Sequence, residues 1–321
     1  MVFKKVQSQP SKPDERIHVS LTRLVSLRYQ ARGFSFLPKQ PVKSVLTGRK
    51  RSAIRGRGLD FIELRDYRPG DDIRTMDWRV TNRTGKPHVR VYAEEKDRSV
   101  VLLVDQRRSM FFGSQWEMKS VTAAELAALS IWRVLDVGDR VGAVIFNDSN
   151  IEEFKPSRNQ ASVLQMLSRL SKLNCSLSIE PSNQERNLPK AVSIEQVLKE
   201  AERLVGHDYL VVLISDFSDW GEAALKRLKS IAQHNDVIAG LVFDPLESDI
   251  SKADQLVVSD GRYQLEIDTR DEALSEKFQA GFQNSVDALQ SEFRKYDIPV
   301  LPISTETAVF EQLRKQLGGI R

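Results

Sequence analysis

The clearest hydrophobic pattern in the chain is a run of aliphatic residues, 100–104, that ends in Asp105. A polar turn follows it, and residues 116–136 then carry apolar side chains at helical spacing. A short, continuous aliphatic run is typical of a parallel strand that is buried on both faces. Open α/β sheets bind their ligands at the carboxyl ends of such strands. The pattern therefore predicts a buried strand that places Asp105 at a candidate site.

The alternation of strand and helix patterns continues to the end of the sequence. Strands are predicted at 141–146, 151–154, 209–214, 237–243 and 300–303, a hairpin at 255–267, and helices at 160–173, 193–204, 222–233, 271–295 and 309–317. The polar stretch 174–187 is predicted to be a long loop. This order predicts an α/β fold with a doubly wound, mostly parallel sheet.

The first third of the chain has a different pattern. Residues 17–32 have apolar positions near helical spacing, after a polar terminus, and the stretch that follows is rich in strand and turn signals. We therefore predict an N-terminal extension with a short helix (1–43), a smaller basic β-rich module (44–98) and the α/β domain (99–321).

Charge is distributed unevenly between these parts. Residues 1–98 hold 23 Lys and Arg against 11 Asp and Glu, whereas the remaining residues hold 25 against 33, for a net charge of +4. Such asymmetry is typical of two modules with different surfaces.

Composition excludes several classes of protein. No apolar run approaches the roughly 20 residues that span a bilayer, and no continuous apolar stretch follows the first lysines, so we expect no secretory signal. Cys175 is the only cysteine, which excludes an intramolecular disulfide and a cysteine-based zinc site. We therefore expect a cytoplasmic protein, and the alternative of attachment to a membrane through a partner stays open.

Four oxygen-bearing side chains are candidate ligands of a metal ion. Asp105 and Asp216 follow predicted strands whose ends lie at the same edge of the sheet, Ser109 follows Asp105 closely, and Ser193 is a possible fourth member. Carboxylates and hydroxyls are the ligands that Mg²⁺ prefers. The alternative interpretation is that Asp105 and Asp216 only cap the helices that follow them.

A second candidate region, residues 56–78, is dense in charge and also contains aromatic residues. It is either a salt-bridged loop that docks on the other domain or a surface that recognises a partner. The region resembles a motif of the bacterial and archaeal family known as domain of unknown function 58. The residues that carry the resemblance are Gly56, Gly58, Phe61, Leu64, Arg65, Tyr67, Gly70, Asp71, Asp72, Arg74, Asp77 and Trp78. The segments 89–94 and 214–217 also resemble the family.

The resemblance implies a von Willebrand factor A-like fold with a metal-ion-dependent adhesion site. In such domains the first loop reads Asp-x-Ser-x-Ser, and Asp105 and Ser109 match its ends while Arg107 replaces the middle serine. A guanidinium cannot ligate a cation. Our hypothesis is that the site is degenerate, with Arg107 paired to Asp105 and Asp216 in place of the metal, so that Mg²⁺ is disfavoured.

The resemblance also implies a function. It predicts a non-enzymatic adaptor that works with a MoxR-type AAA+ ATPase in an assembly or stress-response system. Two alternatives remain open. One is a Mg²⁺-dependent hydrolase that uses Asp105, Asp216 and the aspartates of 66–77, and the other is a nucleic-acid-binding protein that uses the basic run 47–58.

Overall fold

A computed structural model describes residues 14–34, 59–94, 98–178, 191–250, 256–259, 264–267 and 272–318. The chain divides into two compact units, of which one comprises Met1–Lys39 and Arg98–Arg321 and the other Gln40–Asp97. The basic run 47–58, with Gly56 and Gly58, lies outside the described residues, as does the side chain of Phe61. Most of the expected loop 174–187 also lies outside them.

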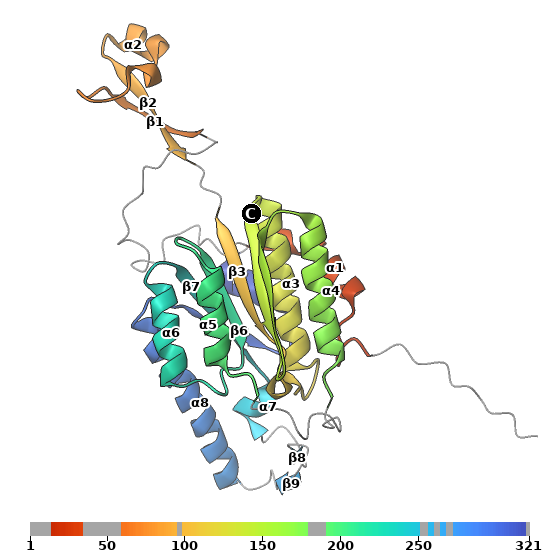
Figure 1. Ribbon diagram of the computed structural model, residues 1–321. Coiled ribbons are helices and arrows are strands. Elements are labelled where there is room, and N and C mark those ends of the chain that lie inside the picture. Colours follow the sequence, from red (N-terminus) through yellow and green to blue (C-terminus); the bar gives the residue numbers. More distant parts are fainter. Residues whose placement is uncertain are drawn as a thin grey trace, which may run out of the picture. The chain divides into compact units, whose positions relative to one another are not determined.

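The larger unit is built on a six-stranded sheet (Figure 1). In spatial order its strands are β10 (Val300–Ser304), β7 (Asp236–Phe243), β6 (Leu210–Ser215), β3 (Ser99–Asp105), β4 (Arg140–Phe146) and β5 (Ile151–Ser157). All neighbouring pairs are parallel except β4 and β5, which are antiparallel. The predicted α/β class with a mostly parallel sheet is confirmed.

Helices cover both faces of this sheet. One face carries α1 (Leu21–Ser26), α3 (Lys119–Val137), α4 (Gln160–Cys175) and α9 (Val309–Leu317), and the other carries α5 (Ile194–Leu204), α6 (Glu222–Ala232) and α8 (Glu272–Arg294). Figure 1 shows α1, α3 and α4 together on one face of the sheet, and α5 and α6 in front of the opposite face. A short helix, α7 (Pro245–Ser248), follows β7, and the expected hairpin is formed by β8 (Leu256–Ser259) and β9 (Gln264–Ile267).

The central strand explains why two layers of helices are needed. Every residue of β3 is buried, and its side chains alternate between two hydrophobic clusters. Val100, Leu102 and Val104 pack with the α3 side, while Val101 and Leu103 pack with the α5 side. Alternation follows from the two-residue period of a strand, so a strand that is apolar at every position must be covered on both faces.

The N-terminal segment packs on α3 in the larger unit. The single helix expected at 17–32 is instead α1, followed by two 3₁₀ turns, η1 (Leu27–Tyr29) and η2 (Ala31–Gly33). The Trp132 indole Nε1 donates a hydrogen bond to the carbonyl oxygen of Leu24 at 2.9 Å. Tertiary contacts of this kind override the local helical pattern.

The smaller unit is an antiparallel pair of strands, β1 (Leu59–Asp66) and β2 (His88–Glu94), joined through η3 (Ile73–Thr75) and α2 (Trp78–Thr84). The strand and turn signals correctly indicated β-structure in this stretch, but the pairing of β1 with β2 and the helix α2 were not predicted. Its signals are nevertheless ordinary, because Asp77 caps its first turn and Gly85 ends it with a positive φ of 70°.

Candidate functional site

The candidate site lies where β3 and β6 end side by side. The two strands are parallel neighbours, with Val104 opposite Ile214. The next residues are Asp105, whose side chain is fully buried, and Ser215, whose hydroxyl donates a hydrogen bond to Asp105 Oδ2 at 2.7 Å. The topology therefore brings a buried carboxylate to the carboxyl edge of the sheet, as its sequence pattern predicted.

Arg107 folds back onto this carboxylate. Its backbone N–H donates to Asp105 Oδ1 at 3.0 Å, its Nε to the same oxygen at 3.0 Å, and its Nη2 to Oδ2 at 2.6 Å. The expected pairing with Asp105 is confirmed, but the expected second partner, Asp216, is wrong. The second partner is Asp219, which accepts hydrogen bonds from Nη1 at 2.6 Å and from Nη2 at 2.9 Å. Asp219 Oδ2 also accepts from the Ile194 N–H at the start of α5, at 3.2 Å.

Burial determines the electrostatics of this ion pair. Burial raises the pKa of the Asp105 carboxyl, while the hydrogen bonds and charge of Arg107 counteract part of that effect. For Arg107, burial works against the charged form, but hydrogen bonds to Asp105 and Asp219 outweigh it and raise the pKa of the guanidinium. Arg107 is therefore a fixed positive charge held between two carboxylates.

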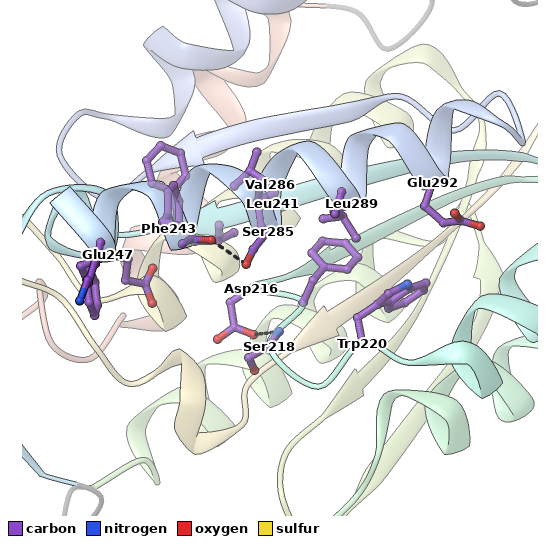
Figure 2. A pocket seen from close by; sticks show the side chains of 17 residues that line it. Asp216, Ser218, Trp220, Leu241, Phe243, Glu247, Ser285, Val286, Leu289 and Glu292 are labelled. Atoms are coloured by element: carbon purple, nitrogen blue, oxygen red, sulfur yellow. Dashed lines mark hydrogen bonds between the residues drawn. The ribbon is translucent and has the colours of Figure 1, made fainter. Parts of the chain in front are cut away.

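A second buried cation lies beside the first. Lys119 Nζ donates hydrogen bonds to Asp216 Oδ2 at 3.1 Å and to Glu247 Oε1 at 2.5 Å, and only 3% of its side chain is exposed. Burial opposes ionisation of Asp216, but the Lys119 ammonium outweighs it and lowers the pKa of that carboxyl. Asp216 Oδ1 also accepts a hydrogen bond from the Ser218 N–H at 3.1 Å (Figure 2).

The two candidate hydroxyls do not join Asp105. Ser109 is exposed in a 3₁₀ turn, η4 (Arg108–Met110). Ser193 caps α5, where its side chain accepts from the Gln196 N–H in a capping box. The alternative interpretation, in which Asp105 and Asp216 cap the helices that follow them, is wrong. The N-cap positions of those helices, α3 and α6, are Met118 and Gly221.

The residues present do not fit a divalent cation. A carboxylate has about four lone-pair sites, and those of Asp105 face the Arg107 N–H, its Nε and Nη2, and the Ser215 hydroxyl. A cation would therefore have to displace Arg107. In the part of the chain that the structure describes, no group of three or more His, Cys, Asp or Glu residues could hold a metal ion.

Sequence reasoning missed Lys119, Asp219 and Glu247. One signal was available, because Lys119 is the first residue of α3, where the positive end of the helix dipole disfavours a cation. A lysine at the start of a helix indicates that carboxylates from other parts of the chain neutralise its charge. Nothing in the local pattern indicates which carboxylates these are.

Several residues of the candidate motif in the smaller unit have structural roles. Arg65 forms a bidentate ion pair with Asp71, in which Nη1 donates to Oδ2 at 2.8 Å and Nη2 donates to Oδ1 at 2.7 Å. Asp72 caps η3, and Asp77 both caps α2 and pairs with Arg90. These contacts agree with the interpretation of a salt-bridged loop.

Other residues of the same motif are wholly or partly exposed. Gly70 has a φ of 105°, which favours glycine in the tight turn before Asp71. Arg74 is exposed, Tyr67 is partly buried, and Trp78 is 61% exposed. The alternative interpretation, a surface that recognises a partner, stays a prediction for these residues.

A family described as "Protein of unknown function DUF58" matches residues 63–287. The chain belongs to this family. Uncharacterized proteins from Mycobacterium bovis and Mycobacterium tuberculosis are 31% identical to it over 225 residues, which cover 69% of this chain and 67% of each relative.

Two solved structures are also similar to this DUF58 chain. A conserved hypothetical protein, BatB, from Bacteroides thetaiotaomicron has 14% identity and a TM-score of 0.36, over 62% of this chain and 98% of that one. An uncharacterized membrane spanning protein from Vibrio fischeri has 15% identity and a TM-score of 0.25, over 61% and 100%. Among the described helices of this chain, none is long and apolar enough to cross a membrane.

Proposed function

We propose that this DUF58 protein is a non-enzymatic adaptor whose larger unit is a von Willebrand factor A-like domain with a degenerate metal site. The strand order, with a single antiparallel strand at one edge, supports this proposal. The family motif supports it as well, because the resemblance implies such a domain after the motif. The domain would recognise a protein partner at the carboxyl edge of its sheet.

The observation that carries the proposal is the position of Arg107 between Asp105 and Asp219. A metal-dependent adhesion site uses an exposed cation to receive a carboxylate from the partner. Here the positive charge belongs to a side chain whose donors are directed at the protein's own carboxylates. Recognition would therefore proceed without a bridging ion, through the surface around the Arg107–Asp219 pair, where the Asp219 side chain is 37% exposed.

The partner in this proposal is a MoxR-type AAA+ ATPase, and the location is the cytoplasm. The partner comes from the family resemblance, and the location is the expectation drawn from the composition of the sequence. Any association with a membrane would be indirect, through a partner.

Calorimetry tests the degenerate site. We expect no heat of binding when Mg²⁺ or Mn²⁺ is titrated into the wild-type protein. Clear binding that is lost in Asp105→Ala would contradict the proposal. The Arg107→Ser variant restores the small hydroxyl that the adhesion-site pattern has at this position, and it provides the matched comparison.

A binding assay tests the recognition surface. The MoxR-type ATPase encoded nearest in the same genome would be purified and its affinity for this protein measured by interferometry, with and without EDTA. We expect binding that EDTA leaves unchanged and that Asp219→Ala weakens about tenfold, as loss of a central charged contact does. Glu200→Ala is the control, since Glu200 also pairs with an arginine but lies on α5. Equal affinity of wild type and Asp219→Ala would show that the partner binds elsewhere.

A further inference from the structure

Two buried amide side chains connect the N-terminal segment (14–34) to the loop that carries Arg107. This loop, residues 106–118, joins β3 to α3, and we call it the edge loop. Gln106 is its first residue, and Asn174 lies in the last turn of α4. Both residues are fully buried, so their polar groups must find partners within the protein. We call these two side chains the amide chain.

The hydrogen bonds of the amide chain all run in one direction. The Val19 N–H donates to Asn174 Oδ1 at 2.7 Å, and Asn174 Nδ2 donates to Gln106 Oε1 at 3.0 Å. Gln106 Nε2 then donates to the carbonyl oxygens of Asp105 and Ser120, each at 3.0 Å. A backbone N–H only donates and a carbonyl only accepts, so the groups at both ends fix the orientation of the two amides. The amide chain therefore joins the N-terminal segment, α4, the edge loop and α3.

A break in the amide chain leaves polar groups buried on both sides of it. Without the Asn174 carboxamide, the Val19 N–H loses its acceptor and Gln106 Oε1 loses its donor. Such unpaired groups are costly in a dry interior, whereas a fully satisfied network holds its members in a single arrangement. The position of the N-terminal segment is therefore linked to that of Gln106.

The N-terminal segment also contacts the middle and the end of the edge loop. The His18 ring stacks on Phe111 with centroids 5.5 Å apart and an angle of 20° between the rings. At the end of the loop, the Met118 N–H donates to the Arg16 carbonyl oxygen at 2.9 Å. Every residue of the edge loop is described, and its regular structure is limited to the single turn of η4. A loop with so little structure of its own takes its conformation from the elements that it contacts.

Gln106 lies between the two residues of the buried ion pair. Its N–H donates to the Phe146 carbonyl oxygen at 2.8 Å, which extends the pairing of β3 with β4, and its side chain holds the Asp105 carbonyl. The Arg107 N–H donates to the carboxylate of Asp105. A shift of the Gln106 side chain therefore moves the backbone from which both Asp105 and Arg107 extend.

We propose that Gln106 and Asn174 are positioning residues, through which the N-terminal segment keeps Arg107 in place on Asp105. This inference rests on the proposed function in one respect, because it names what holds the surface that the partner would recognise. The coupling acts in both directions, so a change in the edge loop also loosens the N-terminal segment.

NMR of the full-length protein tests the inference without a partner. Asn174→Ala should accelerate hydrogen exchange of the Arg107 amide about tenfold, because buried groups on both sides of the break lose their partners. The Arg107 Nε–H signal should also shift, since this group donates to Asp105. A chemical shift reports the native state and does not respond to a general loss of stability. The matched control is Ser171→Ala, because Ser171 Oγ donates to the Val19 carbonyl at 2.8 Å and is not part of the amide chain. It should change the exchange of the Arg107 amide less than twofold.

A second variant breaks the amide chain at its other end. Gln106→Met keeps the length of the side chain without its polar groups, and it should reproduce both changes at Arg107. Although Gln106 makes no hydrogen bond to Val19, the amide proton signal of Val19 should shift, because Asn174 loses its second partner. Ser120→Ala is the control, since the buried Ser120 hydroxyl makes no hydrogen bond in the described part of the chain. It should leave the Val19 signal in place.

Two results would overturn the inference. One is an Arg107 amide and Nε–H that are unchanged in Asn174→Ala and in Gln106→Met. The other is an equal acceleration of Arg107 exchange in Asn174→Ala and Ser171→Ala, which would show that the packing of the N-terminal segment, and not the amide chain, holds the loop. Failure of the proposed function is distinguishable. In that case Asp219→Ala leaves ATPase binding unchanged, while Asn174→Ala still accelerates exchange at Arg107.

Discussion

Removing the guanidinium of Arg107 should destabilise the larger unit strongly. The Arg107→Ala variant leaves Asp105 fully buried with only the Ser215 hydroxyl and the backbone N–H of residue 107 as donors. Breaking a buried ion pair by removing one partner costs about 3–5 kcal/mol. The half-exposed Asp219 can be solvated by water instead, and loss of such a pair costs about 0.5 kcal/mol. We therefore expect the free energy of unfolding to fall by about 3–4 kcal/mol, nearly all of it because of Asp105.

A double-mutant cycle separates this cause from a general loss of packing. An asparagine at position 105 needs no counter-ion, so Asp105→Asn combined with Arg107→Ala should recover about 2 kcal/mol relative to Arg107→Ala alone. The single variant should also become more stable as the pH falls, because a protonated Asp105 no longer needs a cation. In the Asp219→Ala control the free energy of unfolding should fall by no more than about 1 kcal/mol.

Urea unfolding at pH 7.5, followed by circular dichroism and tryptophan fluorescence, measures these differences. The slope of the free energy against urea must stay constant for the comparison to hold. A loss below about 1 kcal/mol in Arg107→Ala would refute the reasoning. The reasoning would also be refuted if the double variant loses as much free energy of unfolding as Arg107→Ala alone. The loss would then arise from packing and not from charge.

Two further predictions concern other clusters. Burial, with Glu117 nearby, raises the pKa of Glu125 to about 7 despite its ion pair with Arg23. Between pH 4.5 and 7 the native state therefore binds a proton that the unfolded state has lost. Up to about 3 kcal/mol of stability, present below pH 4.5, should be lost as the pH rises through 7. Urea unfolding across this pH range measures the loss, and Glu125→Gln should flatten the dependence of stability on pH. In the smaller unit, Asp77→Ala removes the cap of α2 and the Arg90 pair, and should cost that unit about 1–2 kcal/mol, as followed by hydrogen exchange of the α2 amides.

Each of these has a result that would contradict it. If stability does not change between pH 5 and 8 in wild type, the proton is not held at Glu125. For the smaller unit, Asp72→Ala is the matched control, because Asp72 caps only the single turn of η3. Equal exchange rates in the two variants would show that the cap of α2 contributes nothing.

The sequence alone determined most of the helices and strands of the larger unit, but not α7 or the break of the N-terminal helix after Ser26. The expected helix 222–233 is one residue longer than α6 at its C-terminal end, and the expected strand 209–214 begins and ends one residue before β6. These elements were predictable because their signals are local, namely a two-residue or 3.6-residue period over a whole segment. The position of Asp105 at a sheet edge followed from the same kind of signal.

Only the tertiary structure decided the partners within the candidate site. Arg107 is 112 residues away from Asp219 in the sequence, and Lys119 is 97 residues away from Asp216. The choice of Asp219 over Asp216 depends on how the loop between β6 and α6 directs its two carboxylates toward Arg107 and Lys119, to which a hydrophobic pattern is insensitive. An ion pair forms between the charges that the fold brings within about 4 Å in a dry environment. The sequence could therefore name the charged residues of this edge, while the packing of β3, β6, α3 and α5 determined which of them neutralise one another.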